Sequence, residues 1–202
     1  MKPRYSTNGT INRRAKALSV ALRERDENTS AHCGRVVGLA VELGKELGLS
    51  KAKRALLWIS AKFHDVGKIG IPDEILLKPG KLSDDEIEIV RTHPARSQRI
   101  ISAIDLPHVQ ELGSIVRHHH ERYDGAGYPD GLVGDAIPLL SRIIAVADTY
   151  DTMASGRLYR DAMPHRQIME LLSLERGRQH DPSLFAAFSS VIERSVYRAV
   201  QI

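Results

Sequence analysis

The chain has 202 residues, which is enough for one ordinary domain with a substantial hydrophobic core. Its 29 Lys and Arg residues against 25 Asp and Glu residues give a formal net charge of +4, without the basic block that binds DNA or RNA. This charge remains compatible with a small anionic substrate. The single cysteine, Cys33, excludes an internal disulfide, so we expect Cys33 to serve packing and any metal site to use nitrogen and oxygen ligands.

Hydropathy and the N-terminal sequence predict a cytoplasmic protein that does not contact membranes. No apolar run approaches the roughly 18 residues that a membrane span needs, and residues 1–16 lack the apolar core of a signal peptide. Residues 1–10 are expected to form a flexible N-terminus, and residues 11–202 a single domain.

Helical periodicity runs through most of the chain, and no alternating apolar pattern predicts a strand. Gly48 suits a helix end, and Ser83 with Glu86 has the spacing of a capping box. In chain order, helices are expected at 11–25, 29–48, 51–64, 83–104, 107–119, 139–154, 164–176 and 182–200. The fold class is therefore all-α, a single-domain helical bundle.

One long segment interrupts the helical pattern. Residues 123–138, YDGAGYPDGLVGDAIP, contain four glycines and two prolines and are too long for a simple connection. Long loops of this kind often carry function, so we expect this Gly/Pro-rich loop to be functional.

Histidines and aspartates at predicted helix ends form a candidate ligand set. Each histidine taken alone can be explained as a surface or helix-terminal residue. The stretch RIIAVADTYDTM, however, would have to bury or half-bury the carboxylate of Asp148, and such carboxylates are normally paired or bound to metal. Nitrogen and oxygen donors suit iron, manganese, zinc or nickel. The candidate ligands are His32, His64, Asp65, His93, His119, His120 and Asp148.

Five stretches of the chain resemble the HD-GYP family, the cyclic di-GMP phosphodiesterases of the HD superfamily of metal-dependent phosphohydrolases. The resemblance covers residues 26–190. Its motifs are FHDVGKIGIPDEILLKPGKL, HP at 93–94, HHERYDGAGYPDGLVGDAIPL, RIIAVADTYDTM and HDPSLFAAF. It implies a helical bundle of the HD type with a long GYP loop, and the family's metal-ligand positions coincide with the seven candidates above.

The resemblance also implies individual roles. Asp65 would bridge two metal ions, and His118 would lie outside the ligand set. Lys68 would contact the scissile phosphate and neutralise charge on its oxygens, and Gly67 would let the backbone turn so that Lys68 can do so. Asp65 and Lys68 are therefore the expected catalytic residues.

The implied reaction is hydrolysis of cyclic di-GMP to pGpG, and on to GMP if the linear product rebinds. Two divalent transition-metal ions, iron or manganese first and zinc or nickel as alternatives, would hold and deprotonate a bridging water. Arg157 and Arg160 would contact guanine or phosphate, with solvated arginines at a helix end as the alternative. The signature residues Gly127, Tyr128 and Pro129 would shape the pocket or contact a protein partner.

Two departures from the family pattern matter. Asn28 stands four residues before His32, where members with three metals usually have Glu, so two ions are expected rather than three. Glu27 should point elsewhere on a helix, although a loop before Thr29 would let Asp26 or Glu27 swing in. The sequence GRLYR at 156–160 also departs from the usual Asp-Arg-Pro-Tyr.

Two other functions are also compatible with the sequence. One is a hydrolase of another nucleotide, such as a mixed cyclic dinucleotide. The other is a non-catalytic module that binds a nucleotide or a partner, although modules of this kind commonly lose metal ligands.

Overall fold

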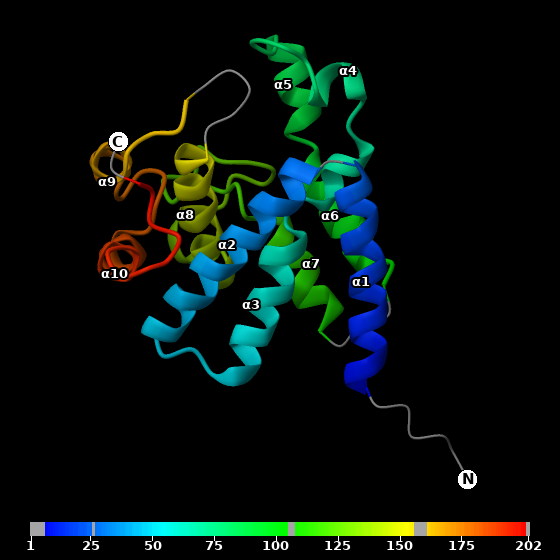
Figure 1. Cartoon of the computed structure of the whole chain (residues 1–202), viewed down its shortest axis with the longest axis horizontal. Helices are drawn as coiled ribbons and strands as arrows, with labels where there is room; N and C mark the ends of the chain where they lie inside the picture. The colour runs from blue at the N-terminus through cyan, green and yellow to red at the C-terminus, as the bar shows by residue number, and fades with distance from the viewer. Residues whose placement is uncertain (1–6, 26, 105–107, 156–160, 201–202) are drawn as a thin grey trace.

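The computed structural model describes residues 7–25, 27–104, 108–155 and 161–200 (Figure 1). Within these ranges the chain is helical and has no strand, which confirms the all-α fold class. The α-helices are α1 (Thr7–Arg25), α2 (Glu27–Glu46), α3 (Lys51–Phe63), α4 (Asp73–Leu76), α5 (Asp84–Val90), α6 (His93–Ser102), α7 (Val109–Arg117), α8 (Leu139–Ala154), α9 (His165–Leu174) and α10 (Pro182–Ile192). Two 3₁₀ helices, η1 (Val66–Gly70) and η2 (Gly134–Ala136), accompany them. Of the helices in the described ranges, none is long and apolar enough to cross a membrane.

Helix α2 organises the bundle. It packs against α3, α8 and α1, while α6 packs against α7 and η1. In Figure 1, α4 and α5 lie at one end of the molecule, away from α9 and α10. The buried core between these helices includes Leu39, Leu43, Leu57, Phe63, Ile115, Ile144, Tyr150 and Phe188. This packing brings the ends of α3 and α7 toward the inner faces of α2 and α8.

Pro94 accounts for the largest departure from the predicted helices. The expected helix 83–104 is wrong as one element, because α5 ends at Val90 and α6 begins at His93. A proline inside a helix lacks the N–H that would bond to the carbonyl four residues earlier, and its ring clashes with that carbonyl. The carbonyl of Val90 is therefore left free for another donor.

The other helix boundaries differ less from the predicted ones. Ser83 and Glu86 form the predicted capping box, and Gly48 ends the α2 segment with a positive φ of 68°. Helix α1 begins at Thr7, inside the segment predicted to be flexible, and η1 and α4 were not predicted. The division into a flexible N-terminus and one domain stays a prediction.

The last predicted helix, 182–200, is too long, because α10 ends at Ile192. Beyond it, tertiary contacts replace helical hydrogen bonds: the backbone N–H of Ala199 donates to the Tyr150 hydroxyl at 2.9 Å. Tyr197 lies so close to Gly38 that a Cβ at Gly38 would be 2.2 Å from its ring.

Candidate metal centre

The seven candidate ligands come from three helices, α2, α6 and α8, and from the segments that follow α3 and α7, and they meet in two groups. The ligand atoms of His32, His64 and Asp148 lie within 4.8 Å of one another, and we call this set group 1. The ligand atoms of Asp65, His93, His119 and His120 also lie within 4.8 Å of one another, and this set is group 2. The two groups are adjacent, because His64 and Asp65 are consecutive residues.

Asp65 faces both groups with different oxygens. Its Oδ1 lies 3.2 Å from His93 Nε2 in group 2, while its Oδ2 lies 3.5 Å from His64 Nε2 and 4.0 Å from His32 Nε2 in group 1. The side chain is 2% exposed. One carboxylate is therefore placed so that each oxygen can serve a different cation.

Helix ends orient three of the histidines. His64 Nδ1 lies 2.8 Å from the Ala61 carbonyl at the end of α3, and His119 Nδ1 lies 2.6 Å from the Val116 carbonyl near the end of α7. His93 Nδ1 lies 2.8 Å from the carbonyl of Val90, which Pro94 left free. The last carbonyls of a helix have no partner within it, so a nearby side chain can satisfy them.

These three hydrogen bonds determine where the ring protons lie. A carbonyl oxygen can only accept, so each Nδ1 carries the proton and, in the neutral ring, each Nε2 carries a lone pair. His93 Nε2 and His119 Nε2 are nevertheless 3.3 Å apart, close enough for two lone pairs to repel. A cation that accepts both lone pairs removes this repulsion.

Buried polar atoms without partners lead to the same conclusion. In the described ranges, His64 Nε2 and Asp65 Oδ1 are buried and make no hydrogen bond. Buried polar groups are normally paired, so atoms of this kind need an explanation such as an ion. The donor set of imidazole nitrogens and carboxylate oxygens fits a divalent transition metal.

The pKa values of the histidines differ between the two groups. Burial, followed by the neighbouring His93, lowers the pKa of His120 to about 3, and burial together with His120 holds the pKa of His119 well below its ordinary value. Burial opposes charge on His32 and His64 too, but carboxylates beside His32, and Asp65 with Cys33 beside His64, outweigh it and raise both pKa values to about 9. Without a metal, protons supply the positive charge that group 1 needs, and a bound ion would release them.

Lys68 lies beside the shared carboxylate. It belongs to η1, and its Nζ is 2.6 Å from Asp65 Oδ2. Although burial opposes it, Lys68 and then His64 hold the pKa of Asp65 well below its ordinary value. The ammonium therefore lies at the edge of group 1, with 16% of its side chain exposed.

Gly67 lies where two backbone segments approach closely, and its predicted role in positioning Lys68 stays a prediction. A Cβ at this position would lie 2.0 Å from the His93 carbonyl and 2.8 Å from Ser97 Oγ, while Gly67 N donates to Ser97 Oγ at 2.8 Å. The glycine permits close packing of η1 against the start of α6, where His93 lies.

The signature loop touches group 2. The Tyr128 ring stacks on His120 with centroids 5.0 Å apart, and the Arg91 guanidinium lies 5.4 Å from the Tyr128 ring centre. A Cβ at Gly127 would lie 2.2 Å from Arg122 N. The loop therefore forms one wall of the candidate site. His118 lies outside both groups, as expected, with Nε2 2.8 Å from Asp130 Oδ2.

Glu121 holds this loop in place and was not singled out from the sequence. Its two oxygens accept hydrogen bonds from Asp130 N at 2.7 Å and Leu132 N at 3.1 Å, and the residue is 3% exposed. Its position directly after His119 and His120 gave no separate signal.

Replacing Glu121 with Ala should destabilise the fold. Two backbone N–H groups would lose their acceptor, at a cost of about 2–4 kcal/mol in the free energy of unfolding, or roughly 5–10 °C in melting temperature for a chain of this size. Thermal unfolding by circular dichroism measures this. The control is Glu88→Ala, which removes an exposed ion pair with Arg91 worth at most about 1 kcal/mol. Equal effects of the two substitutions would contradict this role for Glu121.

Four other residues singled out from the sequence are Arg157, Arg160, Asn28 and Cys33. Arg157 and Arg160 lie outside the described residues. Helix α2 begins at Glu27, so the backbone at Asn28 is helical and the alternative of a loop before Thr29 is wrong. Cys33 is buried, as expected, and its thiol lies within 4.8 Å of the ligand atoms of His64 and Asp65.

Known proteins resemble this chain in sequence. A family model described as HD domain matches residues 15–184. The chain is 43% identical over 173 residues to the cyclic di-GMP phosphodiesterase response regulator RpfG of Xanthomonas campestris pv. campestris, covering 86% of this chain and 45% of that protein. It is 37% identical over 167 residues to 3'3'-cGAMP-specific phosphodiesterase 2 of Vibrio cholerae serotype O1, covering 83% and 32% respectively.

A solved structure supports the fold. The HD domain of the L. monocytogenes phosphodiesterase PgpH superposes with a TM-score of 0.64 at 15% identity, covering 86% of this chain and 94% of that one. The chain spans less than half the length of the curated relatives that it matches, with 45%, 39% and 46% of three of them covered. The family model, the relatives and the fold together show that the chain belongs to the HD domain family and carries the motifs of its HD-GYP members.

Proposed function

We propose that this chain is a metal-dependent phosphodiesterase that hydrolyses cyclic di-GMP to pGpG, and to GMP where the linear product rebinds. The observation that carries the proposal is the placement of Asp65, whose two oxygens face two separate groups of histidine and carboxylate ligands. The name of the Xanthomonas relative supports the choice of substrate.

In this proposal, each group of ligands would hold one ion, and Asp65 would contribute an oxygen to each. When bound, a pair of divalent ions supplies Lewis acidity and activates a water for attack on phosphorus. Iron or manganese is the preferred pair, and zinc or nickel fits the same donors. The neutral amide of Asn28 supports two ions rather than three.

Residues of the chain would orient the ligands and bind the substrate. The tautomers of His64, His93 and His119 are held by backbone carbonyls, so the lone pairs face inward without reorganisation. Lys68 would place its ammonium on a phosphate oxygen of the substrate and stabilise charge that develops there. Tyr128 would limit the volume next to group 2, and Arg157 and Arg160 would bind guanine or phosphate.

The experiment that tests the proposal is a direct assay of cyclic di-GMP hydrolysis. Protein loaded with manganese or iron should convert cyclic di-GMP to pGpG, resolved from GMP by chromatography, and removal of metal with a chelator should stop the reaction. A metal count on the same sample should give two ions per chain. Absence of product at all metal loadings would leave the non-catalytic alternative, which the intact ligand set disfavours.

A second substrate is supported by a specific observation. A relative 37% identical to this chain is named as specific for 3'3'-cGAMP, and GRLYR departs from the usual segment expected to contact guanine. Parallel assays with 3'3'-cGAMP decide between the two. A higher kcat/KM on 3'3'-cGAMP than on cyclic di-GMP would transfer the proposal to the mixed dinucleotide.

A further inference from the structure

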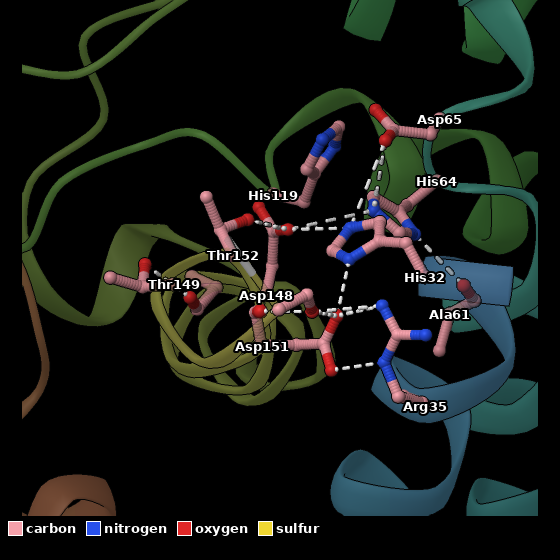
Figure 2. A network of polar contacts seen from close by, with 12 residues as sticks. His32, Arg35, Ala61, His64, Asp65, His119, Asp148, Thr149, Asp151 and Thr152 are labelled. Atoms are coloured by element: carbon pink, nitrogen blue, oxygen red, sulfur yellow. Dashed lines mark hydrogen bonds and ion pairs between the residues drawn. The ribbon is translucent and has the colours of Figure 1, made fainter. Parts of the chain in front are cut away.

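Asp151 touches the candidate metal centre but belongs to neither group of ligands. It lies one turn after Asp148 on α8, is 3% exposed, and has Oδ2 2.7 Å from His32 Nδ1. The other ring nitrogen, His32 Nε2, lies 2.9 Å from Asp148 Oδ1. Figure 2 shows the His32 ring between the two carboxylates.

Arg35 fixes the position of this second carboxylate. Arg35 Nε donates to Asp151 Oδ1 at 2.7 Å, and Arg35 Nη2 donates to Asp151 Oδ2 at 3.0 Å (Figure 2). Ser155 Oγ lies 3.0 Å from the same Oδ2. A forked arginine–carboxylate pair of this kind is strong and directional. Because Arg35 follows His32 by three residues on α2, the same turn of helix supplies the ring and the group that orients its partner.

His32 therefore differs from three other histidines of the centre. His64, His93 and His119 direct Nδ1 at neutral backbone carbonyls, whereas His32 directs Nδ1 at a carboxylate. A carboxylate partner fixes the tautomer with the lone pair on Nε2 and makes the imidazole a stronger electron donor to a metal. His32 belongs to group 1, so its carboxylate partner acts on a ligand of that group.

We infer that Asp151, held by Arg35, is a positioning residue that strengthens the binding of one ion, the ion of group 1. The inference rests on the proposed two-ion site and adds that the two ions are held by differently supported ligands. Loss of the Asp151 carboxylate should weaken the ion of group 1 and spare the other, because in the described ranges no hydrogen bond or ion pair joins Asp151 or Arg35 to a ligand of group 2.

The test replaces Asp151 with Asn. The amide is similar in size but offers one acceptor oxygen instead of two and directs an N–H2 group at Arg35 or His32. Partners of this kind typically contribute 10–100-fold to metal affinity. We expect zinc titration against a chromophoric chelator to show one site weakened by about that factor and one unchanged, and a count after dialysis to fall from two ions to one.

A matched control separates positioning from general destabilisation. Asp181 is another nearly buried carboxylate paired with an arginine, with Oδ2 2.7 Å from Arg142 Nη1, and it lies outside the metal centre. Asp181→Asn should lower stability and keep both ions. Arg35→Gln should give a smaller loss at the same single site as Asp151→Asn.

A spectroscopic signature adds a measurement that does not depend on activity. In zinc-loaded wild-type protein, the Nδ1 proton of His32 should resonate downfield of those of His64, His93 and His119, because its acceptor is charged. In Asp151→Asn it should move toward theirs.

The outcomes distinguish this inference from the proposed function. Two tight ions in Asp151→Asn, equal weakening of both ions, or a wild-type chain that binds none would each overturn the inference. Loss of one ion in Asp151→Asn supports it even if neither cyclic dinucleotide is hydrolysed, in which case the proposed function fails alone.

Discussion

Replacing Asp65 with Ala is expected to abolish hydrolysis of cyclic di-GMP and to lower the bound metal below one ion per chain. Asp65 is the one candidate ligand whose oxygens face both groups, so its removal takes a ligand from each proposed ion. Turnover by chromatography and metal content by mass spectrometry measure the two effects on the same sample.

Two further variants separate loss of the metal ligand from loss of stability. Removing Asp65 leaves the Lys68 ammonium without its carboxylate, which by itself can cost about 3–5 kcal/mol of stability when the pair is buried. Asp65→Asn keeps the shape and should fold, yet it should also be inactive. Asp85→Ala, an exposed acid on α5, should keep wild-type metal and turnover. Wild-type activity in Asp65→Asn with two ions bound would refute the proposed centre.

Replacing Lys68 with Ala is expected to lower kcat by about 10²–10³-fold, while two ions remain bound. Lys68 donates to Asp65 and cannot ligate a cation through its ammonium, so its loss leaves the full set of seven ligands. What disappears is a positive charge at the edge of group 1, where a phosphate oxygen of the substrate would lie.

The measurements are kcat, KM and metal content. Lys81→Ala, which removes an exposed lysine from the loop before α5, should behave as wild type. Loss of metal in Lys68→Ala at unchanged stability would mean that the lysine supports the ligands and does not act on the phosphate. An unchanged kcat would remove Lys68 from the reaction.

Local sequence signals predicted most helices well. The capping box at Ser83 and the glycine at Gly48 are one-turn features, so they act wherever the chain places them. Helix 139–154 was predicted with the bounds that α8 has. The error at 83–104 came from giving periodicity more weight than Pro94, although the steric effect of proline is itself local.

The seven candidate ligands could be named from residue type and from resemblance, because imidazole and carboxylate groups have few reasons to gather at helix ends. Their division into two groups could not. That division depends on distances between helices far apart in sequence, and on which oxygen of Asp65 faces which histidine.

The sequence by itself determined the all-α class, the family and the chemical character of the site, because helical periodicity, motif spacing and donor types are properties of short segments. Only the tertiary structure decided the orientation of the histidines, since helix-end carbonyls and the Asp151–Arg35 pair determine which ring nitrogen keeps its lone pair. It also decided that Gly67 serves close packing against α6 and that Glu121 holds the signature loop. These contacts join segments distant in sequence, and no periodicity or spacing within a segment encodes them.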